Sequence, residues 1–248
     1  MRGSPASAVV KAMSVPLVRV KVGGELACWT RPESKVERVT YDCMTPSAAR
    51  NILDAICWKP EMRWVIHRIL VLKPIRHQSI RRMELRSRVS PITVSKWMRR
   101  PAWFQPLFSG AGEHGDGTLR NTLALRNVSY VIEAHPHVYS DSAQDTRAKY
   151  AAMLERRVRK GQCFTRPYLG MREFAGTFQP PDEADQPIEQ SVSMGTMLYD
   201  IMFGDGGRPN RAIFFTATLD RGCLDTHPVR AIPNESIRKE LLACTYRR

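Results

Sequence analysis

Three observations on the amino-acid sequence predict an α+β fold. Several segments alternate apolar with polar or basic residues, as strands with one buried face do. Two other segments repeat apolar residues at helical spacing and carry start or stop signals of helices. The elements follow in the order strand, helix, strand and then strand, helix over about 160 residues, and this order is typical of an α+β sandwich.

The first strand is expected at residues 17–22, where LVRVKV alternates apolar and basic side chains before Gly23-Gly24 interrupts the pattern. A helix is expected to begin after Thr45, because threonine is a good N-cap and Pro46 suits the first helical position. The segment that follows, AARNILDAI, places its large apolar side chains on one helical face. A second strand is expected at residues 63–72, RWVIHRILVL.

Residues 76–126 show only weak periodicity and contain three prolines and the loop SGAGEHGDG. The next segment, LALRNVSYVIEAHPHVY, is long and rich in Val, Ile and Tyr, and it predicts another strand. A helix is expected over 145–160 with Gly161 as its C-cap. This order of elements predicts an α+β sandwich of the ferredoxin-like type.

The composition changes beyond Phe178. An acidic, proline-rich loop, PPDEADQP, precedes two expected strands, TMLYDIMF and RAIFFTATL, and the chain finishes with a short amphipathic helix, ESIRKELLACTYRR. The sequence therefore predicts a flexible leader at 1–16, a ferredoxin-like domain at 17–176, and a smaller β-rich domain with a C-terminal helix at 177–248.

The charge favours a polyanionic partner. The 248 residues hold 38 Lys+Arg against 24 Asp+Glu, a formal net charge of +14. Nucleic acid is the first candidate and an anionic membrane surface the second, while a generally basic, solvated surface remains the alternative. The positive charge is concentrated, because residues 61–100 carry eleven lysines and arginines against two glutamates.

A second cationic stripe lies on the helix expected at 145–160. Lys149, Arg156 and Lys160 share one face with Met153, although a solvated helix face would explain this stripe by itself. Together with two arginine pairs, the stripe favours a groove that follows RNA or DNA. These pairs are Arg81-Arg82 and Arg99-Arg100. Five tryptophans offer surfaces for base stacking, although buried tryptophans more often fill cores.

Cysteine and histidine usage gives no sign of a metal centre. The six cysteines are scattered without a Cys-x-x-Cys pair, and an ordinary role at a strand end explains the close pair His135 and His137 better than a metal site does. We therefore expect no metal and no cofactor. The N-terminus is a poor secretory signal and no apolar run approaches the roughly 18 residues needed to span a bilayer, so we expect a cytoplasmic protein with reduced thiols that does not enter a membrane.

Longer strings of residues carry a family resemblance. The segment WTRPESKVERVTYDCMTPSAARNILDAICWKPEMRW, followed shortly by VLKPI, resembles the opening of CRISPR-associated "Cas five" proteins of the type I-C (Dvulg) subtype. Three further strings follow in the family's order and approximate spacing, namely LRNVSYVIEAH, KYAAMLERRVRKGQCFTRPYLGMREF and GTMLYDIMF. The resemblance covers most of residues 17–220.

The resemblance implies a RAMP protein, with an RRM-like ferredoxin domain followed by a smaller β-sheet domain. Such a protein cuts CRISPR repeat RNA at the base of its hairpin without a metal, by attack of a 2′-hydroxyl on the adjacent phosphate. It then stays on the 5′ handle of the crRNA within Cascade. The implied partners are the repeat RNA, the backbone and large subunits of Cascade, and target DNA as a possible contact of the assembled complex.

The resemblance also implies site residues. The tyrosine that precedes W-K-P in the family falls on Cys57, and the family's Lys-His pair falls on Lys149 and Tyr150. Lys149 is suited to stabilise the charge of a phosphorane. The thiol of Cys57 and the phenol of Tyr150 are both poorer proton carriers at neutral pH than a histidine. Gly170 lies in a segment that resembles the glycine-rich, RNA-cradling loop of RAMP proteins.

Each of these assignments has a structural alternative. Tyr150 shares a helical face with Leu154 and Val158 and is equally compatible with a packing role, and Cys57 ends an apolar helix face. Three functions therefore stay open: a processing endoribonuclease, a non-catalytic cap on the 5′ handle, and a stand-alone basic RNA-binding protein. Other candidate proton carriers are Tyr41, His67 and His77.

Overall fold

The computed structural model describes residues 17–34, 36–106, 108, 110, 115–139, 146–204 and 209–243. The leader predicted at 1–16, the start of the helix predicted from residue 145 and the end of the C-terminal helix with Cys244 lie outside these residues.

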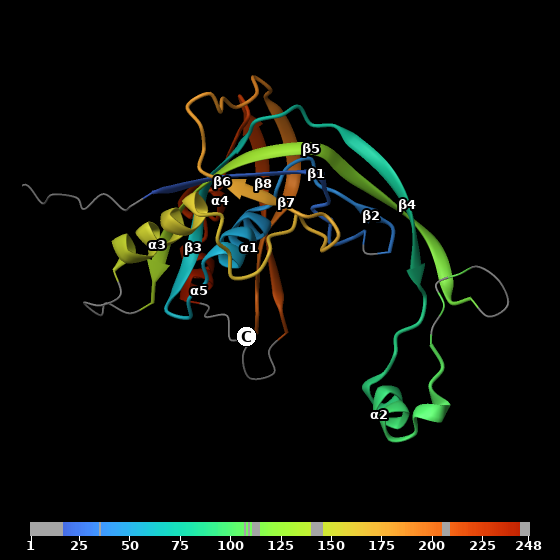
Figure 1. Cartoon of the computed structure of the whole chain (residues 1–248). Helices are drawn as coiled ribbons and strands as arrows, with labels where there is room; N and C mark the ends of the chain where they lie inside the picture. The colour runs from blue at the N-terminus through green and yellow to red at the C-terminus, as the bar shows by residue number, and fades with distance from the viewer. Residues whose placement is uncertain are drawn as a thin grey trace, which may run out of the picture.

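A curled sheet of nine strands organises the described part of the chain (Figure 1). The strands lie in the order β6-β1-β5-β3-β9-β8-β7, and β2 and β4 also pair with β5. All pairings are antiparallel except that of β2 with β5. The strands are β1 (Val18–Ala27), β2 (Arg38–Val39), β3 (Met62–Val71), β4 (His77–Leu85), β5 (Gly117–Val138), β6 (Thr177–Gln179), β7 (Val192–Met202), β8 (Arg211–Asp220) and β9 (Cys223–Asp225).

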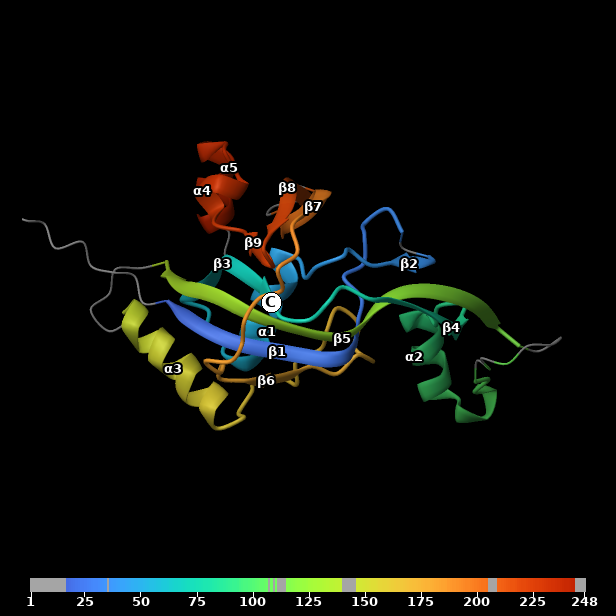
Figure 2. The ribbon, with the colours of Figure 1, turned by 90° about the horizontal axis from the view of Figure 1, so that it is seen from above.

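Two helices cover one face of the central strands. These are α1 (Pro46–Ile56), which packs on β3, and α3 (Arg147–Arg159), which packs on β5 and β1 (Figure 2). The core between them is built from alternate residues of the strands, as the period-two patterns predict. The other helical elements are α2 (Pro91–Arg99), the 3₁₀ turn η1 (Pro101–Trp103), α4 (Pro228–Ala231) and α5 (Glu235–Ala243).

The predicted signals for α1 and α3 are confirmed. The Thr45 hydroxyl accepts a hydrogen bond from the Ala48 N–H at 3.2 Å, and Pro46 stands in the first turn of α1. Thr146 caps α3 in the same way, and Gly161 follows the helix with a φ of +63°. The strands predicted at 63–72, in LALRNVSYVIEAHPHVY, in TMLYDIMF and in RAIFFTATL are also present.

The weak periodicity of residues 76–126 does not mean that this segment lacks regular structure. This segment holds β4, α2 and the first half of β5, which form a ribbon that leaves the body of the molecule and carries α2 at its tip (Figures 1 and 2). No residue of α2 is buried, and β4 is exposed or half-buried throughout. A periodic apolar pattern arises where one face of an element is buried against a core. A ribbon that is held by backbone pairing and buries no face therefore has no such pattern in its sequence.

The expected interruption of the first strand at Gly23-Gly24 is also wrong, because β1 continues to Ala27. A Cβ atom on Gly23 would lie 2.8 Å from the Val128 carbonyl oxygen, and one on Gly24 would lie 2.6 Å from Leu169 Cδ1. The two glycines therefore allow a close approach to neighbouring chain segments within the strand.

A buried ionic cluster joins the C-terminal strands to the central sheet. Asp200 of β7 accepts hydrogen bonds from Arg50 of α1 at 3.0 and 3.1 Å and from Arg63 of β3 at 2.6 Å. Arg50 also donates to Asp54 at 3.1 Å, and Arg63 donates to the Leu241 carbonyl of α5. β9 also pairs with β3, so backbone hydrogen bonds join the C-terminal strands to the central sheet as well.

The division into two domains at residue 176 stays a prediction, and β6, just beyond it, pairs with β1. Within the residues that the structure describes, no helix is long and apolar enough to cross a membrane.

Candidate functional site

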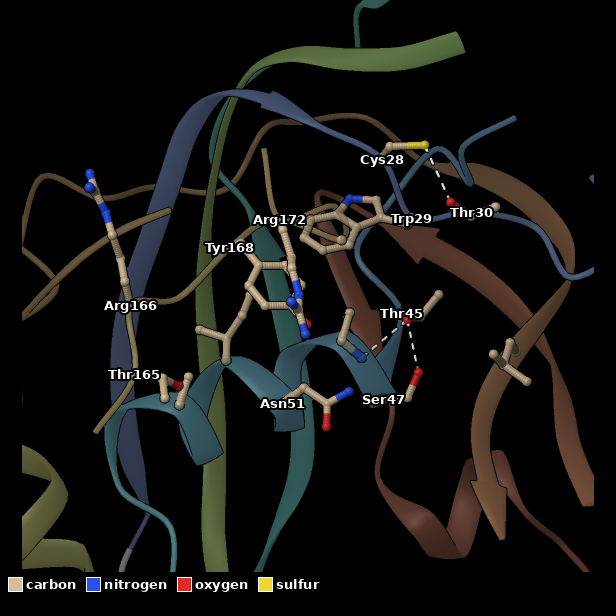
Figure 3. A pocket seen from close by; sticks show the side chains of 15 residues that line it. Cys28, Trp29, Thr30, Thr45, Ser47, Asn51, Thr165, Arg166, Tyr168 and Arg172 are labelled. Carbon is tan, nitrogen blue, oxygen red and sulfur yellow. Dashed lines mark hydrogen bonds between the residues drawn. The ribbon is translucent and has the colours of Figure 1, made fainter. Parts of the chain in front are cut away.

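A groove of about 820 Å³ lies between α1 and the segment that leads from α3 back to the sheet (Figure 3). We call this segment, residues 163–176, the return loop. The groove is lined by Cys28, Trp29, Thr30, Thr45, Ser47, Ala48, Asn51, Ile52, Ala55, Thr165, Arg166, Tyr168, Gly170, Arg172 and Leu198.

Backbone hydrogen bonds fix the return loop at both walls. The N–H groups of Phe164 and Thr165 donate to the Ala55 carbonyl at 2.9 Å each. The Cys28 N–H donates to the Leu169 carbonyl at 3.0 Å. The return loop is therefore attached by backbone hydrogen bonds both to α1 and to the residue that follows β1.

Gly170 is the position in this loop that requires glycine. Its φ is +85°, and a Cβ atom there would lie 2.0 Å from the Cys28 carbonyl oxygen. Both the left-handed backbone and the close approach to β1 exclude a side chain. The predicted RNA-binding glycine thus shapes one wall of the groove.

We expect Gly170→Ala to weaken RNA binding by at least about tenfold, because the loop must leave β1 to relieve the overlap. Filter binding with the protein's own repeat RNA measures this. Gly161→Ala is the matched control, since Gly161 also has a positive φ but a Cβ atom there meets nothing within 4 Å. Equal affinities of the two variants would contradict a shaping role for Gly170.

The predicted cations of α3 are exposed. Lys149, Arg156 and Lys160 all have exposed side chains, and Lys149 Nζ lies 5.2 Å from the centroid of the Tyr150 ring. Tyr150 itself is only 2% exposed and packs in the core with Leu154. Its burial agrees with the packing alternative for this residue.

Cys57 is fully buried at the end of α1, where its carbonyl accepts a hydrogen bond from Trp64 Nε1 at 2.8 Å. Burial raises the pKa of the Cys57 thiol, with the positive charge of Arg157 opposing the shift. Arg157 also donates to the Ile56 carbonyl at 2.7 Å, so this end of α1 faces the last turns of α3. Tyr150 precedes Arg157 by about two helical turns, or roughly 10 Å along the axis.

Four of the five arginines predicted to bind RNA lie on the ribbon. We call this ribbon the arm: residues 77–106 and the part of β5 that pairs with β4. Arg81 is exposed on β4, whereas Arg82 points to the opposite face and pairs with Glu84 and, at 2.9 Å, with Glu173 of the return loop. Arg99 and Arg100 lie at the end of α2, with the Arg100 guanidinium 4.5 Å from the centroid of the Trp103 ring. The structure therefore links Arg82 to the groove wall and carries the α2 pair out to the tip of the arm.

We expect Arg81→Ala to reduce the slope of log affinity against log salt by about 0.7–0.9. Arg82→Ala is expected to change the slope less, because two carboxylates already neutralise the Arg82 charge. Titration of repeat RNA at several salt concentrations separates the two. An unchanged slope for Arg81→Ala would assign that residue to the solvated surface.

The other candidate proton carriers lie outside the groove. Tyr41 is buried, and His77 lies 3.0 Å from Asp42. His67 contacts His135, and burial lowers the pKa of His67 and takes that of His135 to about 3. Among the described residues, no group of three His, Cys, Asp or Glu side chains could hold a metal ion.

Four exposed residues of the groove were not predicted as site residues. Asn51, Arg166, Tyr168 and Arg172 are all exposed in it. The alternation of arginine and aromatic residues around glycines in QCFTRPYLGMREF was the available signal. Asn51 had none, since it lies in the middle of a helix over 100 residues away.

The mixed α/β fold has a curled antiparallel sheet, a basic arm and a cationic groove with an exposed aromatic ring. This surface chemistry is typical of the class of nucleic-acid-binding proteins. Residues 17–212 match the model of the CRISPR-associated protein family Cas5, in its Cas5d form. The chain belongs to this family.

Two relatives and one solved structure are similar to it. The CRISPR pre-crRNA endoribonuclease Cas5d of Mannheimia succiniciproducens is 43% identical over 222 residues, which cover 86% of this chain and 96% of that protein. The protein of the same name from Thermus thermophilus is 40% identical over 193 residues, 77% of this chain and 76% of that protein. A crystal structure of a CRISPR-associated protein has a similar fold, with a TM-score of 0.58, 20% identity, and coverage of 85% of this chain and 91% of that one.

Proposed function

We propose that this chain is a CRISPR pre-crRNA endoribonuclease that cuts repeat RNA at the base of its hairpin and then holds the 5′ handle of the crRNA as a subunit of a type I-C Cascade. Its two Cas5d relatives, each 40% or more identical, carry the name pre-crRNA endoribonuclease. In the structure, the groove supports this proposal most. It brings cationic and aromatic side chains together on a loop that backbone hydrogen bonds attach to the core.

The finer layout follows the same proposal. Residues 17–176 form a RAMP domain of the ferredoxin-like type and residues 177–248 a smaller β-rich domain. The RNA backbone follows Lys149, Arg156 and Lys160 along α3, and this path leads to the return loop because the loop begins just after α3 ends. The arm, with Arg81, Arg82, Arg99 and Arg100, extends this basic surface toward the neighbouring backbone and large subunits and toward target DNA.

The proposed reaction is an internal transfer within the RNA. The 2′-oxygen beside the scissile phosphate forms a bond to its phosphorus, and the bond from phosphorus to the 5′-oxygen breaks. The products are a 2′,3′-cyclic phosphate and a 5′-hydroxyl. A base takes the proton of the 2′-hydroxyl and an acid supplies one to the leaving oxygen. Lys149 stabilises the negative charge of the phosphorane between these steps.

Tyr150 and Cys57 are the family positions for proton transfer, and both are buried here. A buried thiol with a raised pKa is protonated at neutral pH and is a weak base. This observation favours a second candidate function, in which the chain binds the 5′ handle as a non-catalytic cap of Cascade.

Incubating the purified protein with its own repeat RNA in EDTA tests the proposal. A single cut 3′ of the hairpin that leaves a 2′,3′-cyclic or 3′-phosphate end supports the endoribonuclease. A 2′-deoxy substitution at the scissile nucleotide is expected to abolish the cut and to leave binding intact. Tight binding without a cut assigns the cap function. Equal binding of the repeat and of a scrambled hairpin would contradict both the endoribonuclease and the cap function.

A further inference from the structure

One wall of the groove is a single face of α1. Ala48, Asn51, Ile52 and Ala55 follow one another at helical spacing and all line the groove. The alanines leave space at this wall, while the exposed Asn51 places an amide between them. An amide carries both a hydrogen-bond donor and an acceptor, so this wall can read the edge of a planar group.

The opposite wall presents an aromatic ring. Tyr168 is 45% exposed, although Pro167 and Leu169 on either side of it are buried. Its backbone pairs with Ala175, and the Leu169 N–H donates to the Phe174 carbonyl at 2.8 Å. A ring held in solvent by a fixed loop offers a stacking surface at little cost in conformational entropy.

Two arginines line the same groove as this ring. Arg166 and Arg172 lie on the return loop before and after Tyr168, and both line the groove (Figure 3). Both guanidinium groups are on exposed residues. They supply the positive charge that a phosphate beside a stacked base requires.

We propose that the groove binds one unpaired nucleotide of the RNA and reads its base, with the base stacked on Tyr168, its hydrogen-bonding edge on the Asn51 amide and its phosphate at Arg172. This inference rests on the proposed function, because the RNA is the substrate of that function. The groove volume of about 820 Å³ lies within the range of pockets that hold small planar ligands. Asn51 is thus a specificity-determining residue and not a catalytic one.

The test uses the full chain and a set of repeat RNAs in which each unpaired nucleotide beside the hairpin is replaced in turn by the other three. Affinities are measured for the wild type, Asn51→Ala, Asn51→Asp and Tyr168→Leu. Phe214→Leu is the matched control, because Phe214 is also an aromatic residue that is 45% exposed but lies on β8. Thermal melting of each variant checks that the fold is intact.

We expect the wild type to discriminate about tenfold or more between bases at one unpaired position. Asn51→Ala should reduce this ratio to below about threefold, and Asn51→Asp should change the order of bases, because a carboxylate only accepts hydrogen bonds. Tyr168→Leu should weaken binding of all four bases by about fivefold or more, as loss of one stacked base does. Phe214→Leu should not.

Three results would overturn the inference. If repeat RNA binds but no unpaired position shows a base preference, the groove does not read a base and the proposed function stands. If Asn51→Ala keeps the wild-type preference, another residue reads the base. If repeat RNA binds no better than a scrambled hairpin, the proposed function is wrong, and the inference that rests on it is wrong as well.

Discussion

Asp200→Ala is expected to lower the free energy of unfolding by about 3–5 kcal/mol, the usual cost of removing one partner from a buried ion pair. The Asp200 carboxylate is the acceptor shared by Arg50 and Arg63, and its residue is 3% exposed. Without it, two guanidinium groups remain buried with one fewer counter-charge. Because these three residues come from α1, β3 and β7, the loss also loosens the attachment of the C-terminal strands to the central sheet.

The effect of Asp200 depends on pH in a defined direction. Burial would raise the pKa of the Asp200 carboxyl, but the charges of Arg50 and Arg63 outweigh burial and hold its pKa below the usual value. A carboxyl with a lowered folded-state pKa contributes stability above its unfolded pKa of about 3.9 and loses it as the pH falls through the folded value. The difference between wild type and Asp200→Ala should therefore be full at neutral pH and shrink below about pH 4.

Urea unfolding followed by circular dichroism measures this change. Asp220→Ala is the control, because the Asp220 side chain is 73% exposed and its contact with Arg221 is 3.9 Å long. The free energy of unfolding of Asp220→Ala should lie within about 0.5 kcal/mol of that of the wild type. An Asp200→Ala variant that lost less than about 1 kcal/mol would show that the cluster contributes little to stability.

The sequence predicted the elements that bury a face. The N-cap at Thr45, the apolar face of α1 and the alternation in β3 all reflect contact with the core, and each is present. The arm gave no such pattern, because β4 is held by pairing with β5 and no residue of α2 is buried. Periodicity reports burial, so elements without burial escape it.

The candidate site was predictable only in part for a related reason. Positive charge on α3 and on residues 76–100 can be counted along the sequence, and the structure exposes Lys149, Arg81 and Arg99. The groove brings together α1 and the return loop, which are more than 100 positions apart, and depends on the close approach of Gly170 to Cys28. A pairing of this kind is fixed by tertiary packing, which neither propensity nor charge counting describes.

Lys149→Ala is expected to reduce the single-turnover rate of repeat cleavage at saturating protein by about 100- to 1000-fold, the usual effect of removing one group that stabilises transition-state charge. Of the three site residues that the resemblance implies, Lys149 has an exposed side chain, whereas Tyr150 and Cys57 are buried. A cation that binds the phosphorane more strongly than the ground-state phosphate contributes mainly to the rate constant. Its removal should therefore slow cleavage and change the affinity for RNA by less than about threefold. Lys149→Arg, which keeps the charge, should restore most of the rate.

Lys160→Ala provides the contrast, because Lys160 is a cation at the other end of the same helix. It should weaken binding and reduce the salt slope by about 0.7–0.9, since a lysine that only meets the RNA backbone acts through counterion release. Equal effects of the two substitutions on affinity and rate would place Lys149 with the backbone-binding cations. If neither substitution changes the rate while binding stays tight, the charge on α3 holds the RNA without taking part in its cleavage, and the cap function gains the support that the endoribonuclease loses.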